Sequence, residues 1–180
     1  MDNEVLAASL RGHTAEDTVN AMNLLGSTGI DAGLQMMIGL IKDTPRTAMK
    51  SAKAMADLNP VCVRIYPLLV LRSSRMARWY EQGIYSPMSL EQGVELTSDI
   101  YEIFSSENIP VIRMGLQASD MISDPGQKNS QVIAGPWHPA FGHLVHSRRM
   151  FKKACALMEA ERFENDRPDT DREGCRDIIL

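Results

Sequence analysis

Three arginines, Arg72, Arg75 and Arg78, follow one another at intervals of three residues, directly after the longest apolar run of the chain. At this spacing their side chains would share one face of a helix. Guanidinium groups bind the phosphates of RNA or the carboxylate of a substrate. A solvated first turn of a helix has the same pattern, so the sequence leaves both interpretations open.

Three histidines near the carboxyl end, His138, His143 and His146, raise the question of a metal site. His143 and His146 are three residues apart, which places two imidazoles on one helix face. No carboxylate or cysteine completes a ligand set at a suitable spacing, and the cysteines form no CxxC pair. We therefore predict no metal ligands among these residues.

Strands and helices in alternation must position these groups. The run Val61–Arg75 begins with β-branched and aromatic residues, the pattern of a strand buried on both faces, and Pro67 is expected to end that strand. Polar groups follow it, at the end where parallel α/β folds bind ligands. Two more strands are predicted at Ile30–Met37 and Val111–Gly115, and a surface loop is predicted at Ala118–Pro136.

Predicted helices separate the strands. They cover Asp2–Leu10, Thr14 to about Gly26, Pro45–Leu58, Ser74–Gln82, Leu90–Glu107 and Pro139–Phe163. Thr14, Thr44 and Ser89 are N-cap signals. The order predicts an α/β fold with a parallel sheet or barrel segment. Because three strands do not close a barrel and leave an unpaired edge, we expect the chain to form part of something larger.

The bulk properties predict one domain over residues 1–163 and a polar, mobile tail over residues 164–180. A net charge of −4 excludes a global basic field for nucleic acid, although a local basic patch stays possible. No apolar run approaches the ~20 residues of a membrane span, so we expect no membrane partner. Three cysteines without a signal peptide favour a cytoplasmic location.

Five segments also carry a family resemblance. They read LRGHTAEDTVNAM, GLQMMIGLIKDTP, VRIYPLLVLRSSRMARWYEQGIYSPMSLEQGVEL, IPVIRMGLQ and GPWHPAFGHLVHSR. In this order they resemble the carboxyl-terminal half of radical S-adenosylmethionine (radical SAM) proteins, of the Elongator catalytic-subunit-like or oxygen-independent coproporphyrinogen III oxidase-like kind. The resemblance spans about Met1–Phe151. It implies half of a partial parallel (β/α)6 TIM-like barrel, with about three strands, flanking helices and a long C-terminal helix.

The resemblance further implies S-adenosylmethionine and a [4Fe–4S] cluster as cofactors. In the family a CxxxCxxC loop of the amino-terminal half holds the cluster. Cys62, Cys155 and Cys175 do not have this spacing. The cluster ligands are therefore expected outside this chain, which would work with a missing N-terminal barrel half or as a homo-oligomer.

Matched residue by residue, the family motifs imply a set of cofactor-binding residues. Arg11, in the RGH turn, would meet the cofactor's carboxylate, for which a guanidinium is the natural partner. Gln35 would contact its ribose or amino group. Tyr66 and Pro67 match the backbone beside the adenine. Gln117, at the carboxyl end of the last strand, would face the same opening of the cofactor site. The resemblance assigns no catalytic residue.

Two loops depart from the family pattern. The usual PGLPGDT is IGLIKDT here, so Lys42 stands where the family has a glycine. The usual Gly-Thr after LVLR is Ser73-Ser74. The loss of both prolines and this glycine puts the rigidity of the first loop in question.

The implied function is the C-terminal part of a radical SAM enzyme that oxidises or modifies an unknown substrate. Elongator-like members suggest transfer RNA as that substrate, and the oxidase-like members suggest a tetrapyrrole. The alternative is a truncated, non-catalytic barrel half that acts as an oligomer or as an RNA-binding module.

Overall fold

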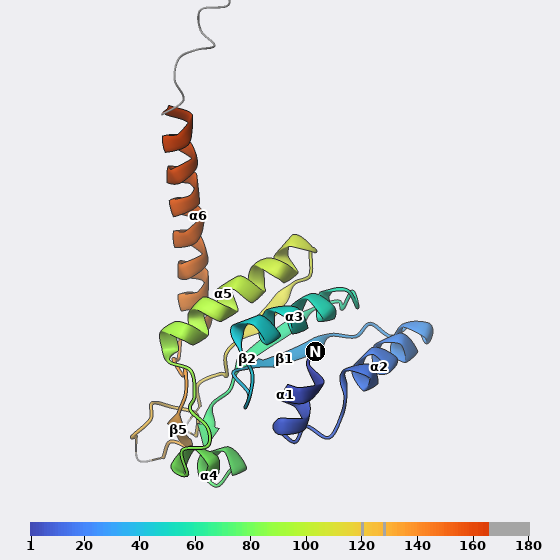
Figure 1. The fold of residues 1–180 in the computed structure, drawn as a ribbon, viewed down its shortest axis with the longest axis vertical. Coiled ribbons are helices and arrows are strands. Elements are labelled where there is room, and N and C mark those ends of the chain that lie inside the picture. The colour runs from blue at the N-terminus through green and yellow to red at the C-terminus, as the bar shows by residue number, and fades with distance from the viewer. Residues whose placement is uncertain (120, 128, 166–180) are drawn as a thin grey trace, which may run out of the picture.

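A three-stranded parallel sheet, in the order β1-β2-β4, forms the centre of the fold (Figure 1). Its strands are β1 (Leu34–Ile38), β2 (Val63–Pro67) and β4 (Val111–Met114). The structure is a computed structural model that describes residues 1–119, 121–127 and 129–165, with side chains to residue 160. The predicted α/β class and parallel sheet are confirmed.

Helices connect and cover these strands. They are α1 (Asn3–Ala8), α2 (Ala15–Ser27), α3 (Pro45–Ala56), α4 (Arg75–Glu81), α5 (Leu90–Ser106) and α6 (Phe141–Asn165). Thr14, Thr44 and Ser89 each accept a hydrogen bond from the backbone amide three residues on and complete a capping box. These three predicted helix starts are therefore correct.

The main core lies between one face of the sheet and the helices α3 and α5. Met36 and Ile38 of β1 alternate with outward-facing neighbours, and Val63 and Ile65 of β2 do the same. Against them pack apolar residues at helical spacing: Ala48, Ala52 and Met55 from α3, and Leu96, Ile100 and Phe104 from α5. The core therefore occupies the helix-covered face and leaves the other face of the sheet open.

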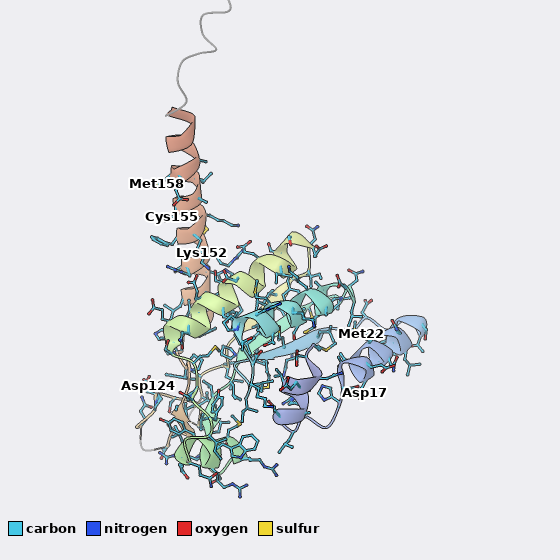
Figure 2. The ribbon with its side chains drawn as sticks, in the orientation of Figure 1. Asp17, Met22, Asp124, Lys152, Cys155 and Met158 are labelled. Carbon is cyan, nitrogen blue, oxygen red and sulfur yellow. The ribbon has the colours of Figure 1, made fainter. Side chains whose placement is uncertain are left out.

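The helix α6 crosses α5 and then leaves the body of the protein (Figure 1). Its first turns are buried at Phe141 and Val145. Arg149 donates to Glu102 at 2.8 Å, and Lys152 lies 2.5 Å from Asp99. Beyond these pairs, Met158 is 59% exposed and stands on the projecting part of the helix (Figure 2).

The segment Ala118–Pro136 is not wholly the loop that the sequence predicts, because it contains β5 (Val132–Ala134), which pairs antiparallel with β3 (Val70–Leu71). The strand β2 ends at Pro67, where the sequence predicts its end. The strand tolerates it because the adjacent bond to β1 is donated by the Leu68 amide, 2.9 Å from the Ile38 carbonyl oxygen.

The strand predicted to begin at Ile30 begins at Leu34. Ile30 lies after α2 and helps to cap its carboxyl end, since its amide donates to the Leu25 carbonyl oxygen at 3.0 Å. The tail predicted from residue 164 lies outside the described residues from 166 onward, and residues 164 and 165 are the last of α6. In the described part of the chain, no helix is both long enough and apolar enough to cross a bilayer.

Candidate functional site

A cleft of about 110 Å³ lies along β1, the edge strand of the parallel sheet, beside α1. Arg11 and Gln35, two of the residues matched to the cofactor, both line it. They come from different elements, the turn after α1 and the strand β1. The fold therefore brings a guanidinium and an amide, groups that bind carboxylate and hydroxyl oxygens, to one cleft.

A short, well-bonded turn holds Arg11 at this cleft. Leu10 and Gly12 on either side both have positive φ, 53° and 71°. The Arg11 amide donates to the Leu6 carbonyl oxygen at 3.0 Å, and a ring nitrogen of His13 lies 3.1 Å from the Arg11 carbonyl oxygen. His13 is thus a hydrogen-bond partner within the turn. The Arg11 Nη1 atom reaches the sulfur of Met37 on β1 at 3.6 Å.

The carboxyl end of this turn is fixed by Thr14, the N-cap of α2. The Asp17 carboxylate accepts the Thr14 amide at 2.7 Å and the Thr14 hydroxyl at 2.8 Å. These two hydrogen bonds lower the pKa of Asp17, with the backbone bond as the larger cause. The ionised carboxylate also suits the positive end of α2.

The open face of the sheet carries a row of polar side chains. Gln35 and Met37 point away from the core, because they alternate with buried Met36 and Ile38. In the parallel register Gln35 lies beside Arg64, and Arg64 beside Arg113. All three are exposed. Two guanidinium groups and an amide therefore lie side by side on this face.

The sequence analysis did not single out Arg64 or Arg113. A signal for Arg64 exists, since it is a charged residue between apolar residues in VRI, and such a residue must face away from the core. Alternation gives no such signal for Arg113, because the neighbouring Ile112 is itself 55% exposed and the register between β2 and β4 shifts at Val63 and Arg64. Only the register of the sheet shows that both arginines join Gln35 in one row.

The remaining matched residues lie along the same end of the sheet but outside this cleft. Tyr66 is the register partner of Met37 and is only 9% exposed, so little of its ring is open to a ligand. Pro67 lines a separate small pocket with Trp137 and His138. Gln117 is exposed three residues after β4. The structure thus brings Arg11 and Gln35 together and leaves the other three apart from them.

The loop after β1 is held by side chains in place of the family's prolines. The Asp43 carboxylate accepts the Gly39 amide at 3.0 Å, and the Tyr85 hydroxyl donates to the Gly39 carbonyl oxygen at 2.6 Å. Burial, with a smaller contribution from Asp43, raises the pKa of Tyr85 to about 12. This phenol therefore stays protonated and keeps donating.

The chain's own residues do not fit an iron–sulfur cluster. Residues 1–119, 121–127 and 129–160 contain no group of three or more histidine, cysteine or acidic side chains placed to hold a metal. Cys62 lies directly before β2 and Cys155 lies on α6, and both are half-buried. His138 accepts the Ala140 amide at 3.1 Å, and His146 packs edge-on against Tyr101. By contrast, the guanidinium and amide of the Arg11 cleft do fit the polar groups of S-adenosylmethionine.

Comparison with known proteins gives one family match and several relatives. The family model described as the Radical_SAM C-terminal domain matches residues 60–150, half of the chain. The tRNA uridine(34) acetyltransferase of Methanocaldococcus jannaschii is 33% identical over 103 residues, which are 53% of this chain and 18% of that protein. The uncharacterised protein YtqA of Bacillus subtilis is 31% identical over 99 residues, 55% of this chain and 31% of that protein.

The solved structure of Methanocaldococcus infernus Elp3 with an N-terminal deletion has the same fold. It superposes with a TM-score of 0.64 at 24% sequence identity, over 84% of this chain and 34% of that chain. The chain thus spans about a third or less of the length of these relatives. The row formed by Gln35, Arg64 and Arg113 therefore lies in an architecture that Elp3 shares.

Proposed function

This chain belongs to the radical SAM C-terminal domain family, and we propose that it supplies one wall of an S-adenosylmethionine site to a radical SAM enzyme of the Elongator-like kind. The observation that carries the proposal is the cleft shared by Arg11 and Gln35. Family membership supports S-adenosylmethionine as the ligand, and the shared cleft supports Arg11 and Gln35 as residues that would meet it.

The proposed roles follow from the chemistry of each group. Arg11 binds the cofactor's carboxylate through charge-assisted hydrogen bonds, and Gln35 binds its ribose or amino group. The backbone of Tyr66 and Pro67 lies beside the adenine, which is compatible with the buried ring of Tyr66. Gln117, which follows β4, faces the opening of the cofactor site.

The ligands of a [4Fe–4S] cluster would come from outside this chain. When bound, such a cluster supplies the electron that cleaves S-adenosylmethionine to a 5′-deoxyadenosyl radical. The part of this chain is to bind and orient the cofactor, and an N-terminal barrel half or a second subunit completes the site.

For the substrate we propose RNA, and transfer RNA in particular. A relative that is 33% identical over the matched segment is named a tRNA uridine(34) acetyltransferase, which favours RNA over a tetrapyrrole. Transfer RNA modification takes place where transfer RNA is present, so a cytoplasmic location is part of the proposal.

Calorimetric titration of the whole chain with S-adenosylmethionine tests the proposal, with size-exclusion chromatography as a measure of assembly. We expect binding that Arg11→Ala weakens about tenfold or more, the effect of losing a hydrogen bond to a charged group. Arg46→Ala is the matched control, because Arg46 is exposed on α3 and does not line the cleft. No binding by the wild-type chain, or equal effects of both substitutions, contradicts the proposed site.

A further inference from the structure

One face of α4 carries a basic and aromatic surface that the cofactor site does not use. Arg75, Arg78, Trp79 and Gln82 line a shallow depression of about 350 Å³. Their spacing of three, four and seven residues places them on one side of the helix. We call these four residues the α4 surface.

The two arginines of the α4 surface are not neutralised within the described part of the chain. Other basic residues are paired there, for example Lys42 with Glu4 and Arg149 with Glu102. Arg75 and Arg78 are exposed, and no carboxylate lies within 4.0 Å of either among the described residues. The acidic residue of α4, Glu81, does not line the depression. The surface thus presents two unpaired positive charges.

Helix stability does not account for Arg75. It is the first residue of α4, where the positive end of the helix dipole disfavours a cation. The third arginine of the sequence pattern is different, because the Arg72 Nε atom donates to the Ser130 carbonyl oxygen at 3.0 Å. Arg72 therefore ties α4 to the segment before β5, and only Arg75 and Arg78 are left for a partner.

The indole of Trp79 is fixed by packing beneath these charges. It is half-buried against the second hydrophobic cluster, which contains Leu68, Val70 and Tyr85. The same cluster includes Met37, whose sulfur contacts Arg11, and Leu40 of the loop after β1. Trp79 of the α4 surface and Met37 of the Arg11 cleft therefore pack against the same cluster, which connects α4 to the carboxyl end of β1.

We propose that the α4 surface binds single-stranded RNA at the rim of this site. Arg75 and Arg78 contact successive phosphates, and the exposed part of Trp79 stacks on a base. Fixed aromatic rings beside guanidinium groups suit unpaired nucleotides better than an acidic peptide, which offers charge but no base to stack. The inference rests on the proposed function in its choice of RNA, but it concerns residues outside the cofactor cleft.

The test measures binding of a fluorescein-labelled 12-nucleotide oligouridylate to the whole chain by anisotropy, at several salt concentrations. The variant R75A/R78A removes the two charges of the α4 surface. The control K50A/K53A removes two exposed charges at the same spacing on α3. We expect the arginine variant to bind at least about tenfold more weakly. Its salt dependence should fall by about 1.4 in log–log slope, 0.7 for each lost phosphate contact.

Tryptophan fluorescence gives a second readout that does not depend on a destabilising substitution. The chain has two tryptophans, and the buried Nε1 of Trp137 has no hydrogen-bond partner among the described residues, so Trp137→Phe breaks no such bond. In this variant we expect the oligouridylate to quench Trp79, and polyglutamate to leave its emission unchanged.

Three outcomes overturn the assignment and separate it from the wider proposal. RNA binding that is equally sensitive to both double variants, or polyglutamate binding as tightly as RNA, shows that the α4 surface is not an RNA site while RNA remains the substrate. Wild-type affinity weaker than about 10⁻⁴ M, the weak end of non-specific nucleic-acid binding, contradicts the RNA surface. Binding of S-adenosylmethionine at the Arg11 cleft would stand in each case.

Discussion

The Tyr85 hydroxyl donates a 2.6 Å hydrogen bond to the carbonyl oxygen of Gly39, 46 residues earlier in the chain. It ties the loop after β1 to the segment that precedes α5. Together with the Asp43 carboxylate, which accepts the Gly39 amide at 3.0 Å, this bond holds the backbone of the loop at Gly39. The loop's position therefore depends on side chains that can be tested singly.

We expect Tyr85→Phe to lower the free energy of unfolding by about 1 kcal/mol, the net value of one such hydrogen bond. Urea unfolding at pH 7 measures this. Tyr80→Phe is the control, since Tyr80 is 38% exposed and its hydroxyl makes no hydrogen bond within the described residues. Equal stability of the wild-type protein and Tyr85→Phe would show that the bond contributes nothing.

The same residue predicts a pH dependence. Its pKa is about 12 in the folded chain against 10.0 as the reference value, so the unfolded chain loses the proton first as pH rises. The stability contributed by Tyr85 is complete below pH 10 and is lost between about pH 10 and 12. Tyr85→Phe should therefore flatten the fall in stability over this interval, measured by urea unfolding at successive pH values.

Ser73 and Lys42 have left-handed backbones where the family has glycine. Their φ angles are 60° and 62°, in the region that side chains with a Cβ atom disfavour. We expect Ser73→Gly to raise the free energy of unfolding by roughly 0.5–1 kcal/mol, since relief of this strain exceeds the entropy that glycine adds to the unfolded chain.

The neighbouring residue gives a control of opposite sign. Ser74 is the N-cap of α4 and accepts the Ala77 amide at 3.1 Å, so Ser74→Ala should destabilise by about 1 kcal/mol. Thermal unfolding of both variants measures the contrast. If Ser73→Gly instead lowers the free energy of unfolding, then the Ser73 side chain stabilises the fold by more than its left-handed backbone destabilises it.

Gly135 is required both for its backbone angle and for space. Its φ is 115°, and a Cβ atom there would lie 2.9 Å from the Leu68 carbonyl oxygen. Gly126 has a similar φ of 99° but has nothing within 4 Å of a Cβ position. Gly126→Ala should therefore lower the free energy of unfolding through backbone strain alone, by about 1–3 kcal/mol. Gly135→Ala should lower it by more. Equal losses of unfolding free energy in the two variants, measured with urea, would show that the close approach of Gly135 to Leu68 can relax.

The sequence predicted those features that depend on neighbouring residues. Helix starts were correct at Thr14, Thr44 and Ser89, because capping is a contact between residues three positions apart. The strand β5 was missed, since its three residues show no alternation and are specified by pairing with β3, about 60 residues earlier. Register is a non-local property, and for the same reason Arg64 and Arg113 were not linked to Gln35.

The family resemblance added what local patterns did not contain. It pointed to Arg11 and Gln35, which the structure places in one cleft. It also pointed to positions 42 and 73, two of the five non-glycine residues with a positive φ in the described part of the chain. Contact of all five matched residues with the cofactor stays a prediction, and Tyr66, Pro67 and Gln117 do not line that cleft.

The most direct test of the account is NMR spectroscopy of the whole chain with ¹³C-labelled methionine methyl groups, titrated with S-adenosylmethionine. Met36, Met37 and Met55 line the Arg11 cleft, whereas Met150 and Met158 are 68% and 59% exposed on α6. Signals are assigned through single Met→Leu variants. We predict saturable shifts of the cleft methionines, Met37 above all, that need about tenfold more S-adenosylmethionine or more in Arg11→Ala and the wild-type amount in Arg46→Ala. Shifts confined to α6, or no shifts at all, would contradict the account.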